Sequence, residues 1–139
     1  LQQISNFAIS SIRKGICAFV AICREDDVED IEYIVRKLLN LRLFNNMETG
    51  RRWDKSLKDL ELEILCISQF TLFSSIKGNK LDFHKSMNPT DSLKLYSGFV
   101  ESLRKAYISN LDGEFGAYMN VKIENDGPVT IILDSKNRE

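Results

Sequence analysis

Apolar side chains recur every three or four positions in two stretches of the chain, which is the spacing of an amphipathic helix. The first stretch covers residues 28–40 and follows a pair of aspartates, which are typical of helix N-caps and first turns. The second follows Asn88 and Pro89, a helix start signal, and continues to Tyr107. The pattern therefore predicts one helix over residues 28–40 and a second that begins at Asn88.

The other apolar segments are rich in β-branched and aromatic residues, which predicts strands. Residues 6–13 and 16–23 are predicted to form a hairpin around Lys14 and Gly15. Residues 63–74 are apolar on both faces, as in a central strand. Shorter strands are predicted over residues 41–44, 113–124 and 128–134, with a turn at 125–127 and a loop at 75–89. This order of strands and helices indicates an α+β fold without repeated βαβ units.

The length and composition suit a single domain. With 139 residues, 43% of them hydrophobic, the chain can bury one core, so the domain is predicted to cover residues 1–139. Residues 135–139 alone are expected to form a frayed tail. Lysine and arginine number 19 against 20 aspartates and glutamates, which gives a formal net charge of −1. This balance argues against a polybasic nucleic-acid binder but leaves room for a local basic patch.

Membrane, secretory and metal-binding classes are not predicted. The longest apolar run, residues 16–23, is far shorter than the ~20 residues that cross a bilayer, and the N-terminal residues lack the features of a signal peptide. The three cysteines lie in apolar runs without a Cys-x-x-Cys pair, and we interpret them as core thiols in a reducing compartment: Cys17, Cys23 and Cys66. Because His84 is the only histidine, a histidine-rich metal site is excluded. We expect a cytoplasmic protein without metal or cofactor.

The sequence contains no common catalytic motif. It lacks a Walker loop, a dinucleotide-binding glycine motif and a nucleophile elbow. His84 is the only imidazole available as a base, and nothing in the spacing pairs it with Ser68, Thr71 or Cys66. Residues 113–116 carry two glycines that suit either a phosphate cradle or a bulge at the start of a strand.

The predicted loop at residues 75–89 holds the densest group of cationic side chains without matching acids. We interpret this group as a candidate phosphate-facing patch, formed by Lys77, Lys80, His84 and Lys85. Composition and spacing alone therefore predict an α+β domain with one basic patch.

Two short motifs indicate a family. They are Ser68-Gln69-Phe70-Thr71-Leu72, at the end of the central apolar run, and Asn125-Asp126-Gly127-Pro128-Val129-Thr130, at the final turn. Further segments agree in the same order, at residues 39–44, 53–59, 77–83 and 115–121. Together they resemble the D-aminoacyl-tRNA deacylase family, also called D-tyrosyl-tRNA deacylases, over residues 12–135. The resemblance implies a barrel-like β core with two helices.

The chain departs from the family pattern at three places. Members begin with a strand of the Met-Arg-x-Val-Ile-Gln-Arg-Val type, which this sequence lacks. Leu81 stands where the family usually has proline, and the loop before Lys77 is slightly shorter.

The resemblance implies hydrolysis of the ester that joins a D-amino acid to the 3′-terminal adenosine of tRNA, and also of glycyl-tRNA, as chiral proofreading in translation. It assigns the catalytic role to the segment Ser68, Gln69, Phe70 and Thr71. Thr71 is the obvious nucleophile, but its hydroxyl has no basic neighbour in sequence. We therefore favour a mechanism in which the vicinal ribose hydroxyl assists and backbone donors around residues 68–70 stabilise the oxyanion.

In the family, Gly127 and Pro128 form a Gly-cisPro pair that enters the pocket of the partner subunit. This implies a homodimer in which rigid backbone atoms exclude the side chain of an L-amino acid. The alternative is a plain turn that begins the last strand. The resemblance further implies that Phe83, Met119 and Gly116, with Phe70, line the substrate pocket, and that the basic patch binds tRNA.

Two other functions remain open at this point. One is a nucleic-acid-binding protein related to DNA replication factors, whose animal members carry a longer C-terminal region. The other is a paralogue that clears mischarged L-alanyl-tRNA, in which both motifs are altered. The forms Ser68-Gln69-Phe70-Thr71 and Gly127-Pro128-Val129-Thr130 favour the D-specific enzyme.

Overall fold

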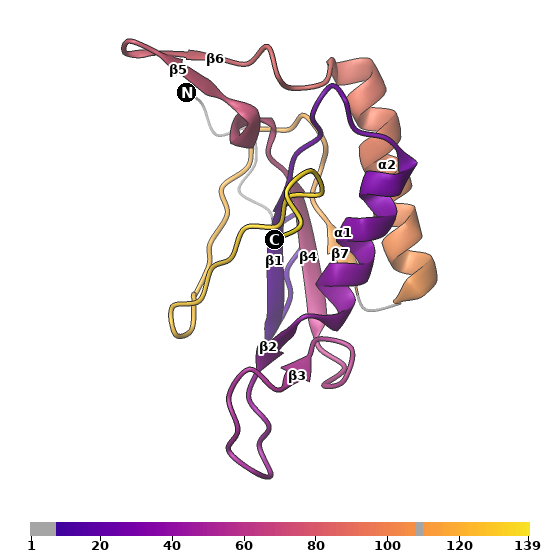
Figure 1. Cartoon of the computed structure of the whole chain (residues 1–139), viewed down its shortest axis with the longest axis vertical. Helices are drawn as coiled ribbons and strands as arrows, with labels where there is room; N and C mark the ends of the chain where they lie inside the picture. The colour runs from indigo at the N-terminus through magenta and orange to yellow at the C-terminus, as the bar shows by residue number, and fades with distance from the viewer. Residues whose placement is uncertain (1–7, 108–109) are drawn as a thin grey trace.

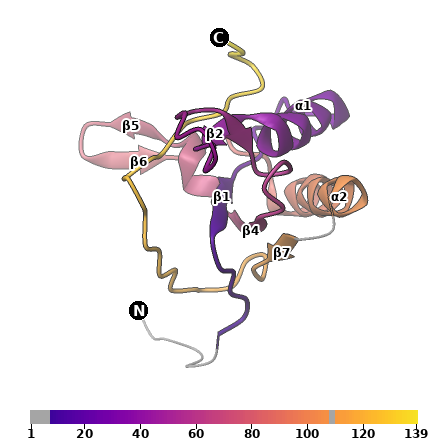
Figure 2. The same ribbon diagram turned by 90° about the horizontal axis from the view of Figure 1, so that it is seen from below.

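The computed structural model describes residues 8–107 and 110–139, with a small parallel sheet at its centre. Strands β1 (Gly15–Val20), β4 (Glu63–Ser68) and β7 (Asn110–Asp112) pair in the order β1-β4-β7. Helices α1 (Val28–Asn40) and α2 (Pro89–Ala106) lie side by side on one face of this sheet (Figures 1 and 2). The prediction of an α+β fold with two helices is confirmed.

Two small hairpins lie at opposite ends of the molecule (Figure 1). Strands β2 (Arg42–Phe44) and β3 (Lys55–Ser56) form one, which follows α1. Strands β5 (Ser75–Lys77) and β6 (Lys80–Asp82) form the other, and a 3-10 helix, η1 (Phe70–Phe73), connects it to β4. The central sheet thus separates a β2–β3 end from a β5–β6 end.

Helix α1 begins where the aspartates predict. The Asp27 carboxylate accepts a hydrogen bond from Glu29 N at 3.0 Å, and the Asp30 carboxylate accepts one from Asp27 N at 2.9 Å. These reciprocal bonds form a capping box and satisfy backbone donors that the first turn leaves free. Helix α2 has Asn88 as its N-cap and Pro89 at its first position.

The hydrophobic core lies between the two helices and the sheet. Its most deeply buried side chains are Leu57, Ile64, Cys66, Phe99 and Leu103. Tyr107, which ends α2, donates a hydrogen bond from its hydroxyl to the Leu62 carbonyl, with 2.5 Å between the oxygens. This bond fixes the end of α2 beside the start of β4.

The predicted hairpin around Lys14 and Gly15 is wrong. Residues 8–14 form no strand, and β1 pairs instead with β4 in parallel, with Gly15 opposite Glu63 and Val20 opposite Ser68. The part of the predicted hairpin at residues 6 and 7 lies outside the described residues. A strand pattern predicts extended backbone but not the partner, which here is a segment about fifty residues further along.

Other segments also differ from the sequence prediction. Strand β1 ends at Val20 and β4 ends at Ser68, and η1 begins two residues later at Phe70. The predicted loop at residues 75–89 contains the β5–β6 hairpin. Residues 113–133 contain no strand, although strands are predicted over 113–124 and 128–134. They run as two extended arms joined by the predicted turn, because the described residues offer them no neighbouring strand.

Residues 135–139 pack back onto the domain, although the sequence suggests a frayed tail. Asp134 and Asn137 form an isolated bridge, and Lys136 pairs with Asp30 of α1. Among the helices of the described residues, none combines the length and apolar character that a membrane span requires.

Candidate active site

The first motif lies where the parallel strands β1 and β4 end. Ser68, the last residue of β4, is opposite Val20, and the Gln69 N–H donates to the Val20 carbonyl at 2.8 Å. The chain then turns into η1, where the Leu72 N–H donates to the Gln69 carbonyl at 3.2 Å. The ends of parallel strands are common places for binding sites, because loops there converge at one edge.

The hydroxyl of Thr71 is hydrogen-bonded to Gln69 and not to a side chain that could act as a base. The Gln69 side-chain amide donates a hydrogen bond to Thr71 Oγ1 across 2.5 Å. Within residues 8–107 and 110–139, no histidine, lysine or carboxylate bonds to this hydroxyl. His84, the base considered from sequence, is instead bound to Asp82. The arrangement gives Thr71 a fixed position but no proton acceptor.

An aromatic pair adjoins the motif. The rings of Phe70 and Phe83 meet edge to face with centroids 5.1 Å apart, and Phe70 is 56% exposed. Ser86 Oγ donates to the Phe70 carbonyl at 3.1 Å, which ties the segment after β6 to η1. The structure thus brings Phe70 and Phe83 together, with an apolar surface open to a planar ligand; that they line the substrate pocket stays a prediction.

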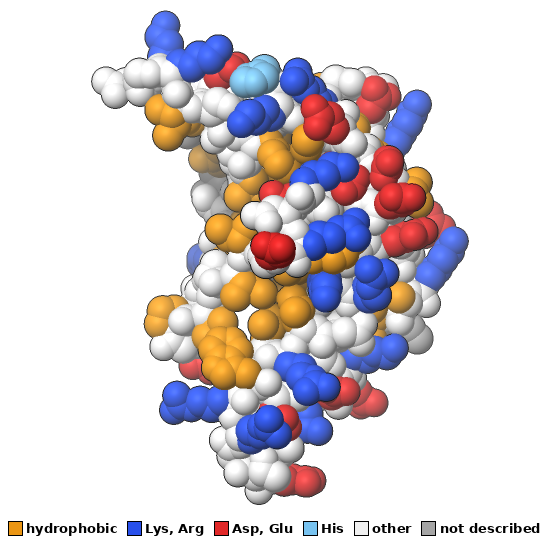
Figure 3. All heavy atoms as spheres, in the orientation of Figure 1, with side chains coloured by type: hydrophobic (Ala, Val, Ile, Leu, Met, Phe, Trp, Pro, Cys, Tyr) orange, Lys and Arg blue, Asp and Glu red, His pale blue; other side chains and the backbone are white. Residues whose placement is uncertain are grey.

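The β5–β6 hairpin presents the basic patch. Lys77 lies opposite Lys80 in the ladder, and Lys77 Nζ pairs with Asp82 Oδ2 at 3.2 Å. His84 Nδ1 bonds to the same carboxylate, and the bonds from His84 and Lys77 lower the pKa of Asp82. In Figure 3 the histidine and neighbouring cationic side chains gather at the β5–β6 end of the molecule. Asp82 thus holds the cationic side chains of the patch in place, a role that the sequence analysis missed. Its position two residues before His84 is only a weak sequence signal for this role.

Lys85 is the fourth predicted member of the patch. Its side chain is exposed, and its carbonyl accepts a hydrogen bond from Arg24 N at 3.0 Å. This bond connects the segment after β6 to the turn that precedes α1.

The second motif forms a closed turn. Asn125 Oδ1 accepts from Val129 N at 3.1 Å, and Asn125 Nδ2 donates to Thr130 Oγ1 at 2.9 Å. The Gly127–Pro128 peptide bond is cis, and Gly127 has φ +124°. A Cβ at Gly127 would lie 2.8 Å from Val129 Cγ2, so this position requires glycine. Asn125, absent from the predicted site residues, holds the turn in shape.

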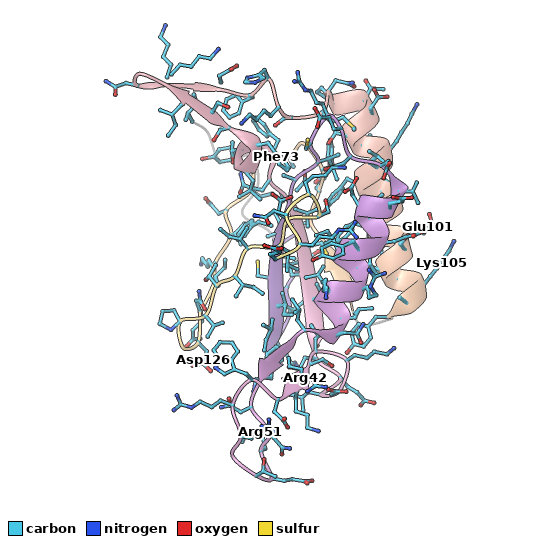
Figure 4. The ribbon with its side chains drawn as sticks, in the orientation of Figure 1. Arg42, Arg51, Phe73, Glu101, Lys105 and Asp126 are labelled. Carbon is cyan, nitrogen blue, oxygen red and sulfur yellow. The ribbon has the colours of Figure 1, made fainter. Side chains whose placement is uncertain are left out.

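The two motifs lie far apart within the chain. Figure 4 labels Phe73, in η1 near the β5–β6 end, and Asp126, at the tip of the turn near the β2–β3 end. A single subunit therefore does not bring Gly127 and Pro128 to the segment 68–71.

Met119 and Gly116, the two remaining predicted pocket residues, make no described contact with the Phe70–Phe83 pair. Met119 packs on Gly113, because a Cβ at Gly113 would lie 3.1 Å from Met119 Sδ. Gly116 has φ +78° in an open turn with nothing within 4 Å of a Cβ position. Their proposed place in the pocket stays a prediction.

A large groove runs along the sheet beside the two arms. Its volume is about 2220 Å³, and it is lined by β1, by residues 118–135, and by Leu72 and Phe73. The arms present a row of exposed apolar side chains to their surroundings, with Ile132 93% exposed: Val121, Ile123, Val129, Ile131 and Ile132. A folded domain rarely leaves such a row uncovered. The sequence signal for it is the alternation of apolar and polar residues over 120–124 in the first arm; the second arm instead has the apolar run Ile131-Ile132-Leu133.

Metal or thiol chemistry finds no support in the described part of the chain. No three histidine, cysteine, aspartate or glutamate side chains are grouped there as a metal site requires. Cys17, Cys23 and Cys66 form no disulfide among the described residues; Cys66 is fully buried, and burial raises the pKa of Cys17.

Comparisons with known proteins agree with the motifs. The family model for D-Tyr-tRNA(Tyr) deacylase matches residues 3–134. A D-aminoacyl-tRNA deacylase of Drosophila melanogaster is 52% identical over 133 residues, covering 94% of this chain and 83% of the fly protein. D-aminoacyl-tRNA deacylase 1 of Bos taurus is 53% identical over 91% of this chain, which spans 61% of the bovine length.

Solved structures support the fold. A structure titled c-Myc DNA Unwinding Element Binding Protein matches with a TM-score of 0.86 and 51% identity, covering 91% of this chain and 85% of that one. A probable eukaryotic D-amino acid tRNA deacylase matches with a TM-score of 0.72 at 20% identity, covering 83% of this chain and 82% of that one, which shows the fold alone.

Proposed function

This chain belongs to the D-Tyr-tRNA(Tyr) deacylase family, and from this membership we propose that it hydrolyses the ester bond of D-aminoacyl-tRNA. Water adds to the acyl carbon, the ester C–O bond breaks, and the products are a free amino acid and tRNA with its ribose hydroxyl restored. The observation that carries the proposal is the pair of motifs: one holds Thr71 at a strand end and the other forms a glycine-dependent turn. Glycyl-tRNA is a second substrate, because glycine has no side chain to exclude.

Backbone donors stabilise the oxyanion in this proposal. The Gln69 N–H is already bonded to Val20, so it is not one of them. The N–H groups of Phe70 and Thr71 begin η1, where the first turn provides no acceptor of its own. Two such donors aimed at a developing charge are the usual device for acyl transfer.

The tRNA end binds across the aromatic pair and the basic patch. Phe70 offers an exposed ring on which the terminal adenine stacks, and a base stacked on an aromatic ring contributes about 1–3 kcal/mol. Lys77, Lys80, His84 and Lys85 contact phosphates of the acceptor end. Asp82 keeps Lys77 and His84 in place, because it bonds to both.

A second copy of the chain completes the site. Within one subunit Asp126, at the tip of the turn, lies away from Phe73 at the end of η1 (Figure 4). In the proposed two-fold dimer, each Gly127–Pro128 turn reaches the partner's pocket. The exposed apolar row on the two arms is the surface that such a dimer covers. Light scattering should give twice the 16.0 kDa of one chain, and a monomer that still hydrolyses D-substrates would contradict the arrangement.

The decisive experiment is a deacylation assay with D-tyrosyl-, L-tyrosyl-, glycyl- and L-alanyl-tRNA. We expect release of D-tyrosine and glycine, and much slower release of either L-amino acid. Rapid hydrolysis of L-alanyl-tRNA would identify the relaxed paralogue, and binding of duplex DNA without hydrolysis would identify the replication-related function. Neither alternative is favoured by the motifs or by the names of the Drosophila melanogaster and Bos taurus relatives, although one solved structure of 51% identity has a title that names DNA binding. As an enzyme of translation quality control, it would act in the cytoplasm.

A further inference from the structure

The C-terminal residues fasten the end of the second arm to helix α1. Lys136 Nζ lies 3.0 Å from Asp30 Oδ2, and only 6% of Asp30 is exposed. The Arg138 guanidinium lies over the ring of Tyr33, 4.2 Å from its centroid. Tyr33 is also buried, so both contacts reach into the first two turns of α1. We call these four residues, Asp30, Tyr33, Lys136 and Arg138, the C-terminal clasp.

The Asp30 carboxylate needs a cationic partner because it is buried. Burial raises its pKa, but hydrogen bonds from Asp27 N, Ser135 and Lys136 outweigh this and lower the pKa to about 2. The carboxylate therefore stays charged, and a buried charge without its cation is costly. The hydrogen bond that Lys136 Nζ donates to Asp30 in turn raises the pKa of Lys136. The ion pair thus sets the position of the segment that follows Asp134, because Asp30 is fixed in helix α1 and Lys136 must lie beside it.

The two arms are attached to the rest of the domain only at their ends, as far as the described contacts show. At the first end the Gly113 N–H donates to the Cys66 carbonyl at 3.0 Å, and the Phe115 ring packs on Tyr96 with centroids 5.6 Å apart. At the second end Leu133 packs on the core and the C-terminal clasp follows. Between them, residues 118–132 make no ladder bond to a strand of the described chain. Asn125 keeps the turn in shape, but the ends decide where the turn lies.

We propose that the C-terminal clasp positions the Gly127–Pro128 turn for substrate discrimination, with Lys136 and Asp30 as positioning residues. This inference rests on the proposed function, in which the turn meets the amino acid. Lys136 is eight residues from Pro128 along an extended arm. If the clasp loosens, the turn therefore shifts its position or samples a wider range of positions. Displacement of a reacting or excluding group by about 1 Å can change a rate by about a hundredfold.

The test changes Lys136, because Asp30 also closes the capping box of α1. Lys136→Met removes the cation and keeps the length of the stem, and Lys136→Arg restores a cation. The matched control is Lys105→Met, since Lys105 pairs with Glu101 at 3.9 Å on the exposed face of α2, away from the arms. Each variant is assayed on D-tyrosyl- and L-tyrosyl-tRNA, and the ratio of the two kcat/KM values is the readout.

We expect Lys136→Met to lower the D-over-L ratio by about tenfold or more, while Lys136→Arg stays within about twofold of the parent and Lys105→Met leaves the ratio unchanged. Amide hydrogen exchange, which needs no activity, should become about tenfold faster in residues 121–138 of Lys136→Met, which include the segment of the clasp itself, and in no other described segment. An unchanged ratio with unchanged exchange would overturn the inference. So would faster exchange spread over the whole domain, which marks general destabilisation.

The two hypotheses fail in different ways. If the parent chain hydrolyses no aminoacyl-tRNA, the proposed function is wrong, and the exchange measurement still decides whether the clasp holds the arms. If the parent discriminates D from L and Lys136→Met does so equally well, the proposed function stands and the positioning role is wrong.

Discussion

The side-chain amide of Gln69 donates a hydrogen bond to Thr71, with 2.5 Å between Nε2 and Oγ1. The bond occupies an acceptor lone pair of the hydroxyl oxygen, whereas a nucleophile requires a base that accepts its proton. We therefore propose that Thr71 orients the segment that follows β4 and supplies its backbone N–H, and that the attack on the ester does not pass through its side chain.

Thr71→Ala should accordingly retain most of the activity. We expect kcat/KM on D-tyrosyl-tRNA to fall by less than about tenfold, against the several orders of magnitude that follow loss of a covalent nucleophile. Single-turnover kinetics measure this, with Thr90→Ala in the exposed first turn of α2 as the control. A collapse in rate with intact folding and tRNA binding would demonstrate covalent catalysis by Thr71.

Binding of tRNA should depend on the β5–β6 hairpin. Replacing Lys77, Lys80 and Lys85 by methionine should lower the slope of log affinity against log salt by about 0.7 to 0.9 for each phosphate that the variant no longer neutralises. The control triple, Lys58, Lys94 and Lys105 to methionine, removes equal charge from elsewhere on the surface and should leave the slope unchanged. Equal effects of both triples would place the tRNA interface outside the patch.

Gly127→Ala should impair both activity and discrimination. The new Cβ would lie 2.8 Å from Val129 Cγ2 at a φ of +124°, which side chains rarely adopt, so the turn must change shape. We expect kcat/KM on D-tyrosyl-tRNA to fall by about tenfold or more and the D-over-L ratio to fall with it. Gly98→Ala, which adds a methyl group in helix α2 at ordinary contact distance, should change neither value. Parent-like kinetics in Gly127→Ala would show that the turn does not meet the substrate.

Acid should weaken the domain partly through Asp30. Its pKa is about 2 in the folded chain and 3.8 in the absence of interactions, so the unfolded chain binds the proton more readily. The stabilisation is therefore complete above pH 3.8 and is lost as the pH falls towards 2. The difference in Tm between the parent and Asp30→Asn should shrink over this range. A difference that stays constant from pH 5 to pH 2 would show that the Asp30 carboxylate does not contribute through its charge.

Gly15→Ala should be strongly destabilising. A Cβ at Gly15 would lie 1.8 Å from the Glu63 carbonyl oxygen, and because both groups are backbone the strands β1 and β4 must separate. We expect a loss of about 3 kcal/mol in the free energy of unfolding, measured by urea titration with Gly98→Ala as the control. An unchanged midpoint would show that the β1–β4 pairing in the structure is wrong.

Local signals were sufficient for the helices and for the family. The spacing of apolar residues and the aspartate caps predict α1 over residues 28–40, and Asn88 with Pro89 predicts the start of α2; both are correct, because capping and periodicity are properties of neighbours in sequence. The two motifs likewise suffice to indicate a deacylase, since their residues are contiguous.

The tertiary structure decided which strands pair and where the two arms and their motifs lie. The sequence shows that residues 16–20 are extended, but only the fold pairs Gly15 with Glu63, and only the fold leaves the arms at 113–133 without a neighbouring strand among the described residues. It also joins Asp30 to Lys136 across 106 positions and separates Phe73, in η1, from Asp126, at the tip of the second motif's turn (Figure 4). The physical reason is that strand pairing, ion pairing and the burial of a carboxylate depend on which distant segments pack together, and local preferences do not specify that choice.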